Sequence, residues 1–549
     1  MKLKTLLAIC LAFFGFSKLS AQNFEETMSN GQIRGNFQFD MQYYQEDSAI
    51  GAQQPSEEIL SNGFLNLIYT NGNFSTGIRY ESYQNALLGF PNGYKGNGLT
   101  YRFATFKKDK LTVTAGNFYE QFGNGLAFRS YEERGLGYDN AMDGIRIKYE
   151  LMEGINLTGL TGKQRIFFEY GEGIVRGFDA DISLNSVFKS LKENKTKIRV
   201  GGSAVSKYQA DQDSRYVLPE NVATFAGRVN INRGKINFNG EYAYKSNDPS
   251  GDNGFIYKPG EAIFLQSSYS QKGLGLVLSA KRNDNMSFRS NRTESQQNLL
   301  INYLPALTKQ HTYNLLATLY PYATQLNGEV AFQADLIYKF KKGTMIGGEN
   351  GMDIQINYST ANNIDTTQLN DENTLRKGYK SDYFKIGEVF FKDFNFQIDK
   401  KFSNKIKGRF TYANLVYNQE VIAGKPGNPT VYANVGIADV TYKFTMRNSL
   451  RTEAQVLLTE QDHGDWATLL LEYSYSPHWF VAILDQYNYG NAISKQRVHY
   501  YNASVGYNNK GNRITMSYGR QRAGIFCVGG VCRVVPASNG LYLSITSSF

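Results

Sequence analysis

The chain has 549 residues and a formal net charge of +10, and it contains 39 tyrosines and 36 phenylalanines but only 2 tryptophans. The basic balance does not indicate a nucleic-acid partner, because the lysines gather in short turns such as 107–110 and 192–195 and no groove-reading motif accompanies them. Abundant aromatic residues in a chain of mixed polarity are typical of β-strands with one apolar and one polar face.

Residues 1–21 have the pattern of a secretory signal peptide. A basic start, Met1–Lys4, precedes an almost wholly apolar run that ends at Phe16, and Ala21 is a small residue suited to cleavage. No later stretch supplies the roughly 20 apolar residues that a transmembrane helix needs. Any membrane crossing by residues 22–549 must therefore use β-strands, and we expect these residues to form one domain.

The first strand of the mature chain is expected to begin near Gln32, because apolar and polar residues alternate from there. The apolar set is Ile33, Gly35, Phe37, Phe39, Met41 and Tyr43, and the polar set is Arg34, Asn36, Gln38, Asp40 and Gln42. Such alternation suits a sandwich or a barrel, in which the polar face meets a wet lumen. Only about ten residues separate the signal peptide from this strand, which leaves no room for an N-terminal plug domain.

Similar strands recur along the chain, joined alternately by short turns and by longer polar loops. The expected turns are 71–73, 107–110, 153–154, 192–195, 232–235, 271–273, 305–311, 341–351, 400–405, 446–449, 476–478 and 508–512, and the longest loops include 46–62, 84–97, 245–260 and 359–385. Short periplasmic turns and long external loops are typical of an outer-membrane barrel.

Twelve short turns predict an all-β fold, a single large transmembrane antiparallel β-barrel with about 26 strands and an expected range of 22–26. An even number of strands puts both termini in the periplasm. A barrel of this size has a backbone diameter of roughly 50 Å. Loops or bulky side chains must therefore fill the lumen if the membrane is to stay sealed.

Residues 116–144 are the best candidate for a loop that folds inward, because they combine aromatic residues with balanced charges. Three interpretations are open: an ordered external loop with local ion pairs, a lumen constriction that selects solutes, and a catalytic pair of carboxylates. The charged residues of the candidate constriction are Glu120, Arg129, Glu132, Glu133, Arg134, Asp139 and Asp143.

Two segments of this loop also carry a family resemblance. Tyr-Glu-Gln-Phe-Gly-Asn-Gly at 119–125 and Arg-Ser-Tyr-Glu-Glu-Arg-Gly-Leu-Gly at 129–137 resemble a Bacteroidota family of large outer-membrane β-barrel proteins of unknown function. The similarity runs over most of the mature chain. It implies a barrel fold and an outer-membrane location, and it implies no activity.

Cys527 and Cys532 are the only cysteines of the mature chain, and they flank Gly529 and Gly530 in an expected external loop. In an oxidising compartment this arrangement predicts a disulfide. A metal site would need further ligands, and the four histidines are scattered along the chain. The bridge would stiffen an apolar loop tip, which serves either for docking a partner or for protease resistance.

The sequence gives little support for an enzyme. The strongest candidate is Asp462-His463-Gly-Asp465, and a lone histidine between carboxylates is usually a solvated loop residue. We find no phosphate-binding glycine loop and no zinc motif. We therefore expect no catalytic residues, no cofactor and no metal.

The last ten residues, Gly540–Phe549, read as the closing strand of a barrel. Leu541, Leu543, Ile545 and Phe549 form an apolar row, and polar residues alternate with most of them. A strand that ends the chain on an aromatic residue resembles the signal that outer-membrane barrels present to their assembly machinery. We expect that machinery and the lipids of the outer membrane to be partners of this chain.

The sequence supports two competing functions. The first is a pore or channel for polar solutes whose lumen is occluded by residues 116–144, which the polar lumenal faces favour. The alternative is a non-enzymatic platform or component of an outer-membrane assembly or protein-secretion complex, in which long loops and the Cys527–Cys532 tip contact envelope proteins. The large size and the stiff apolar loop favour the platform.

Overall fold

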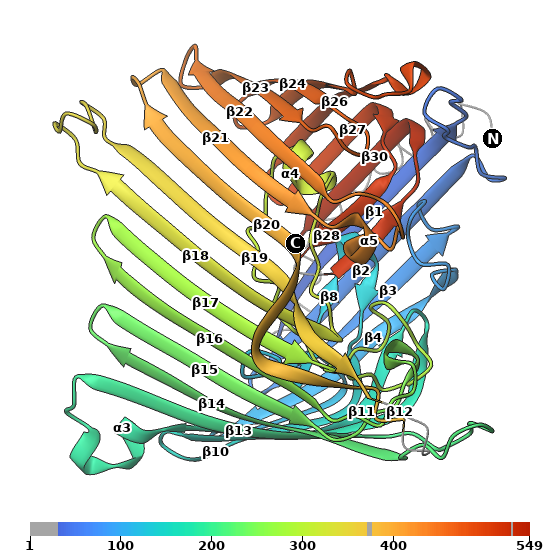
Figure 1. The fold of residues 1–549 in the computed structure, drawn as a ribbon, viewed down its shortest axis with the longest axis vertical. Coiled ribbons are helices and arrows are strands. Elements are labelled where there is room, and N and C mark those ends of the chain that lie inside the picture. The colour runs from blue at the N-terminus through green and yellow to red at the C-terminus, as the bar shows by residue number, and fades with distance from the viewer. Residues whose placement is uncertain (1–30, 370–375, 529–530) are drawn as a thin grey trace.

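The computed structural model describes residues 31–369, 376–528 and 531–549, without the side chains of 526–532. Within this part, 24 strands form one antiparallel β-barrel in which each strand pairs with the next along the chain (Figure 1). The last barrel strand, β30, pairs with the first, β1, and closes the barrel. The predicted signal peptide, residues 1–21, lies outside the described residues and stays a prediction.

The barrel strands are β1 (Gln32–Gln45), β2 (Ile59–Asn71), β3 (Phe74–Gln84), β4 (Gly96–Lys108), β5 (Leu111–Phe118), β10 (Met142–Met152), β11 (Ile155–Ile166), β12 (Glu169–Ser183), β13 (Thr196–Tyr208), β14 (Asn221–Arg233), β15 (Ile236–Lys245), β16 (Gly260–Gln271), β17 (Leu274–Asp284), β18 (Gly328–Phe340), β19 (Met352–Gln368), β20 (Tyr379–Lys401), β21 (Ile406–Tyr417), β22 (Val431–Lys443), β23 (Asn448–Leu458), β24 (Trp466–Tyr475), β25 (Trp479–Tyr487), β26 (His499–Asn509), β27 (Asn512–Gln521) and β30 (Ser538–Ser548). The connections contain β6 (Glu120–Phe122), β7 (Phe128–Ser130), β8 (Glu132–Glu133), β9 (Tyr138–Asp139), β28 (Gly524–Val528), β29 (Val531–Val535), the helices α3 (Leu184–Val187), α4 (Asn314–Thr318) and α5 (Gln419–Ile422), and the 3-10 helices η2 (Arg134–Leu136), η3 (Lys189–Leu191), η4 (Gly251–Asn253) and η5 (Ser494–Gln496).

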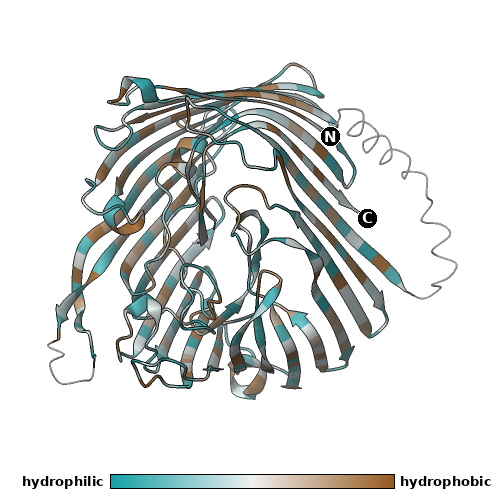
Figure 2. Ribbon diagram, turned by 90° about the vertical axis from the view of Figure 1, so that its right-hand side faces the viewer, coloured by the Kyte–Doolittle hydropathy of each residue, from teal (hydrophilic) through white to brown (hydrophobic). Residues whose placement is uncertain are grey.

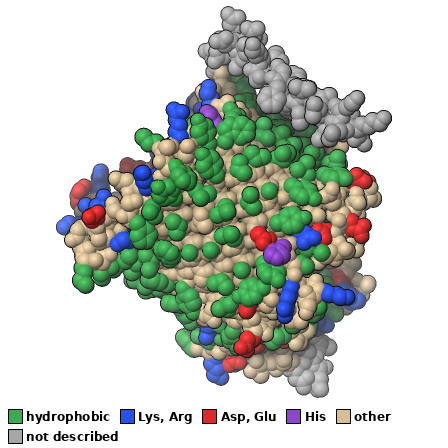
Figure 3. All heavy atoms as spheres, turned by 90° about the horizontal axis from the view of Figure 1, so that it is seen from above, with side chains coloured by type: hydrophobic (Ala, Val, Ile, Leu, Met, Phe, Trp, Pro, Cys, Tyr) green, Lys and Arg blue, Asp and Glu red, His purple; other side chains and the backbone are tan. Residues whose placement is uncertain are grey.

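The outer face of the barrel is apolar, as the alternation of residues predicts. On β10, Ile145 and Ile147 are 49% and 44% exposed, whereas Arg146, between them, turns inward to Glu120. On the side of the barrel seen in Figure 3, hydrophobic side chains are spread over the outer face, and most charged side chains lie toward the edges of the view. None of the described helices has the length and apolar character needed to span a membrane.

The closing strand has the two faces that the sequence predicts. In the register of the sheet, Leu543 lies between Met41 of β1 and Met516 of β27, so the apolar row continues across three strands. The polar row of β30 includes Tyr542, whose hydroxyl donates to Asp40 on β1 at 2.8 Å. Phe549 follows the strand and exchanges backbone hydrogen bonds with Gly35. Its role in assembly stays a prediction.

The best estimate of 26 strands is wrong, although 24 lies within the expected range. All but one of the twelve predicted turns connect neighbouring barrel strands; the exception, 305–311, lies within the long connection between β17 and β18. The apolar residues around this segment, including Leu304 and Leu315, are buried against the barrel wall, so they form no strands of their own. Removing one hairpin from the count removes two strands.

The expected loop 359–385 is also largely wrong. β19 continues to Gln368 and β20 begins at Tyr379, so most of this segment is paired strand. Its polar composition suggests a loop, yet Thr366 and Thr367 pair with Ser381 and Lys380. Threonine suits an extended, half-exposed strand, so the composition of the segment does not prevent pairing.

The cysteine loop lies elsewhere than expected. Its two strands, β28 and β29, form a hairpin whose backbone register pairs Cys527 with Cys532. The hairpin packs against η2 and α4, in two other loops, so it is not a free external tip. The side chains of both cysteines lie outside the described part, and the disulfide stays a prediction.

We expect the purified, denatured and unreduced protein to show no thiol that reacts with maleimide, because the hairpin register places Cys527 and Cys532 opposite each other. The double substitution Cys527→Ser and Cys532→Ser should leave a folded barrel, since the wall strands hydrogen-bond without the hairpin. Heat-dependent gel migration checks folding of this variant. Two reactive thiols per unreduced mature chain would refute the bridge.

Candidate functional site

Three long connections fold into the barrel: the β5–β10 loop (119–141), the β17–β18 loop (285–327) and the β27–β30 loop (522–537). Figure 2 looks into the barrel from the end that carries the long connections and shows ribbon segments inside the ring of strands. We take the lumen around these three loops as the candidate functional site.

The β5–β10 loop contacts the wall at β15, five strands along the barrel from β10. Its strands β6 and β7 pair as a small hairpin, and Gly123 and Gly125 near the tip have positive φ values of 53° and 95°. At the tip, the backbone N–H and side-chain Nδ2 of Asn124 donate to Glu241 of β15, at 2.6 and 2.8 Å. The loop is thus held at its tip as well as at its two ends.

A buried network of two arginines and three carboxylates fixes the base of this loop. Arg165 of β11 donates to Asp139 of the loop at 2.6 Å and to Glu81 of β3 at 2.7 Å. Arg79 of β3 contacts the same two carboxylates and reaches Glu132 of the loop at 3.0 Å. The side chains of Arg79, Arg165, Glu81 and Asp139 are 2–4% exposed, so these charges depend on one another for compensation.

The remaining residues of the candidate constriction have separate partners. Glu120 pairs with Arg146 and Lys148 on β10, at 3.2 and 2.6 Å. The guanidinium of Arg129 lies between the rings of Tyr131 and Tyr303, at 4.1 and 4.0 Å.

Arg134 pairs with Glu132 at 2.9 Å and donates to Gln38 of β1, while Glu133 is half-buried on β8. Asp143 is not part of the group. Asp143 is two residues before the exposed Ile145 on β10, so its side chain lies on the same, outer face of the strand. There it pairs with Arg102 at 3.1 Å.

Three members of the buried network, Arg79, Glu81 and Arg165, lie on barrel strands and are not among the residues predicted from the sequence. Each lies on the polar face of its strand, and a charged side chain on such a face is usually expected to contact water. The one available signal is that Arg79 and Glu81 are two residues apart and therefore share the lumenal face of β3.

The β17–β18 loop packs on an apolar patch of the inner wall. Val431, Ala433 and Val435 of β22 are at most 1% exposed, whereas Tyr432 between them faces outward and is 59% exposed. The loop covers this patch with a set of buried apolar side chains: Leu304, Leu307, Leu315, Leu316, Tyr320 and Tyr322. The lumen wall is therefore not uniformly polar, contrary to the expectation from the sequence.

Polar contacts continue the attachment of the β17–β18 loop around the wall. His311 contacts Asp393 of β20 at 2.7 Å, and Tyr313 donates to Asp439 of β22 at 3.1 Å. Farther round, Gln486 of β25 donates to Asn314 of α4 at 2.9 Å. The loop thus contacts the wall from its own strands to β25, seven strands along the barrel from β18.

The infolded loops also contact one another. The backbone N–H of Arg129 donates to the carbonyl of Ile301 at 2.8 Å, and that of Tyr303 donates to the carbonyl of Gly125 at 2.9 Å. Asn140 donates through Nδ2 to the carbonyl of Leu300 at 2.8 Å. The β5–β10 and β17–β18 loops therefore form one hydrogen-bonded assembly inside the barrel.

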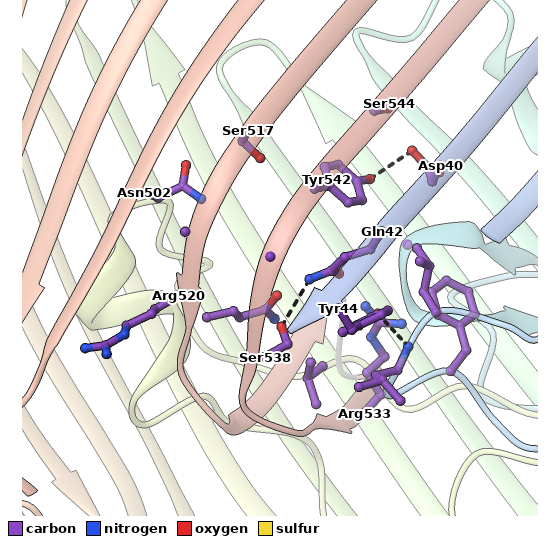
Figure 4. A pocket seen from close by; sticks show the side chains of 18 of the residues that line it. Asp40, Gln42, Tyr44, Asn502, Ser517, Arg520, Arg533, Ser538, Tyr542 and Ser544 are labelled. Atoms are coloured by element: carbon purple, nitrogen blue, oxygen red, sulfur yellow. Dashed lines mark hydrogen bonds between the residues drawn. The ribbon is translucent and has the colours of Figure 1, made fainter. Parts of the chain in front are cut away.

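A cavity of about 430 Å³ remains between these loops and the wall formed by β27, β30 and β1 (Figure 4). Hydroxyl and amide side chains line the wall side, including Gln42, whose side chain donates to Ser538 at 3.4 Å. Arg134 and Arg533 line it from two of the infolded loops. A second cavity of about 220 Å³ shares Asn502, Arg520, Gln521 and Val535 with the first.

Arg533 differs from the other charged residues around the larger cavity. Its guanidinium stacks on Phe90 at 4.4 Å, and its Nε and Nη1 atoms are buried without a hydrogen-bond partner among the described residues. Burial lowers the pKa of Arg533, and it also lowers the pKa of Arg522, which lines the smaller cavity. No carboxylate of the described residues forms an ion pair with either guanidinium.

The described side chains offer no group of three or more histidine, cysteine, aspartate or glutamate residues placed to hold a metal ion. His463 is 48% exposed beside Asp462, with 3.7 Å between Nε2 and Oδ1, and Asp465 accepts from the backbone N–H of Thr459. This geometry is that of a solvated loop.

A model of a family of unknown function (DUF6029) matches residues 1–549. No curated protein matches the sequence. Similar solved structures include the siderophore receptor PirA from Pseudomonas aeruginosa, at 10% identity and a TM-score of 0.41 over 94% of this chain and 80% of that one.

Another is the translocation pore of the P pilus usher PapC, at 7% identity and a TM-score of 0.44 over 94% and 99% of the two chains. A third is the outer membrane protein opdK from Pseudomonas aeruginosa, at 10% identity and a TM-score of 0.35 over 78% and 96%. Because the scores and identities are low, what these proteins bind or transport does not extend to this chain.

Proposed function

The chain belongs to this DUF6029 family of unknown function, and we propose that it is an outer-membrane pore for small polar solutes, restricted by its infolded loops. The outer-membrane location is supported by the closed barrel and its apolar outer face, because a closed barrel satisfies every backbone hydrogen bond of its wall inside a bilayer. Both termini are expected in the periplasm.

The observation that carries the proposal is the cavity beside the loops, whose wall side is polar. The β5–β10 and β17–β18 loops attach to many parts of the wall, yet the side formed by β27, β30 and β1 keeps about 430 Å³ free and lines it with hydroxyl and amide groups. Selectivity in narrow pores comes from such groups and from nearby charges. Solutes would pass along this side while the loops occlude the rest.

We expect the wild-type protein to conduct weakly in planar bilayers and a variant without residues 119–141 to conduct more. Phe118 and Met142 are register partners, so Asn-Gly inserted between them makes a two-residue hairpin and leaves the wall closed. Conductance of both proteins at equal reconstituted amounts is the measurement. If the wild type is silent and the shortened variant is silent too, the pore proposal fails.

The alternative function is a platform in an envelope complex for assembly or protein secretion. One of its supports is an apolar cysteine loop that projects outward, and the packing of β28–β29 against η2 and α4 removes that support; the large size of the barrel still favours it. A platform predicts stable envelope partners that co-purify in mild detergent. A pore needs none.

A further inference from the structure

We propose that the cavity between the infolded loops and the wall formed by β27, β30 and β1 binds a small solute through an oxyanion, a carboxylate or a phosphate, held by Arg533. This inference deepens the proposed pore function by assigning a solute class, and it rests on that function for its role in passage.

The charges around the cavity leave one cation without a carboxylate. Arg134 pairs with Glu132 at 2.9 Å, and Arg520 pairs with Asp47 at 2.6 Å. Arg533 has no carboxylate partner among the described residues, and the sequence just before it, residues 526–532, contains no acidic residue.

The one acid of the lining, Asp40, is already engaged. Its Oδ1 accepts from Tyr542 at 2.8 Å, and its Oδ2 accepts from Gln38 at 2.8 Å. Asp40 is 7% exposed, so it offers little surface to a solute. The charge that the cavity presents to a solute is therefore positive.

A half-buried guanidinium without a counter-charge is costly, because burial removes water that would otherwise stabilise it. An oxyanion restores that stabilisation and forms charge-assisted hydrogen bonds with the planar guanidinium. Phe90 stacks on the guanidinium, whose Nε and Nη1 are buried without a hydrogen-bond partner among the described residues, and an anion would supply the acceptor that these groups lack.

The wall side of the lining suits the polar body of such a solute, whereas Phe64, Leu87, Leu88 and Val535 give the cavity an apolar part as well. Gln42, Asn502, Ser517, Ser538 and Ser544 place amide and hydroxyl groups around the space, from β1, β26, β27 and β30 (Figure 4). The volume of about 430 Å³ falls in the range of small-ligand sites, about 300–1,000 Å³. The geometry therefore fits a hydroxylated anion the size of a sugar acid.

The test is isothermal titration calorimetry of the purified full-length barrel in detergent with gluconate, inorganic phosphate and glucose. We expect gluconate or phosphate to bind and glucose to bind much more weakly; which anion binds separates a carboxylate from a phosphate site. Arg533→Gln should weaken anion binding about tenfold or more, because it removes a charge-assisted contact. Arg533→Lys, which keeps the charge but loses the planar fork, should recover part of the affinity.

Arg199→Gln is the matched control, because Arg199 is also a lumenal arginine but lines a different cavity and is 63% exposed. Absence of anion binding, equal binding of glucose, or equal losses in Arg533→Gln and Arg199→Gln would each overturn the site. Calorimetry detects binding whether or not the barrel conducts. If the protein shows no conductance in bilayers but still binds the anion, the pore function is rejected and the anion site stands.

Discussion

Deleting residues 285–327 should open the barrel more than any other single change. Asp284 and Gly328 are register partners on β17 and β18, so an Asn-Gly turn can join them without altering the wall. The deleted loop extends to contacts on β25, and its removal clears much of a lumen with a backbone diameter of roughly 50 Å. We expect current roughly tenfold above wild type, since a barrel without such a plug conducts as a water-filled channel.

Planar-bilayer conductance of the wild type and this variant, at equal folded amounts, checks the expectation. The shorter deletion of residues 119–141 is the matched control and should give a smaller increase, because the β17–β18 loop still covers its part of the wall. Heat-dependent gel migration confirms that each barrel is folded. A folded Δ285–327 variant with wild-type current would show that the loop does not restrict the lumen.

The wall was predictable because a barrel strand has a local pattern. Alternation along residues such as Ile33 to Tyr43, and turn residues such as Asn71-Gly72, depend only on neighbours in sequence, and the structure has strands and turns at these places. The error in strand number came from Pro305 and its neighbours, which have turn chemistry without a strand on either side. Turn residues alone do not show whether a hairpin belongs to the wall.

The lumen was less predictable because its contacts join distant parts of the chain. The composition of residues 116–144 correctly indicated a packed, ion-paired loop, but Arg165 and Glu81 pair only after strands β3 and β11 are placed around the same lumen. In the sequence, the apolar row that includes Val431 and Val435 cannot be told from a lipid-facing row. The distinction requires knowing which face of β22 points into the lumen. Sequence pattern gives two faces for a strand, and closure of the barrel decides which is inside.

Arg165→Ala should release the β5–β10 loop from the wall. The substitution leaves Glu81 and Asp139 buried with one guanidinium, Arg79, which also serves Glu132. Removing one partner of a buried ion pair typically costs about 3–5 kcal/mol, because the remaining charges stay desolvated. Since the wall strands keep their backbone hydrogen bonds, the cost falls mainly on docking of the loop.

Release of the loop can be measured in two ways: by the rate of limited proteolysis between residues 119 and 141, and by bilayer conductance. Both should be higher in Arg165→Ala than in the wild type. The matched control is Arg199→Ala, because Arg199 pairs with Asp181 at 3.2 Å on the lumenal wall but is 63% exposed, and a solvated pair contributes little.

A second variant, Arg165→Met with Glu81→Gln, removes one charge of each sign from the network. It should recover part of the loss, since removing both partners of a pair leaves fewer unpaired charges than removing one. If Arg165→Ala and Arg199→Ala resist protease equally and conduct equally, the buried network does not hold the loop, and its attachment must come from Asn124 and the packing against Leu300 and Ile301.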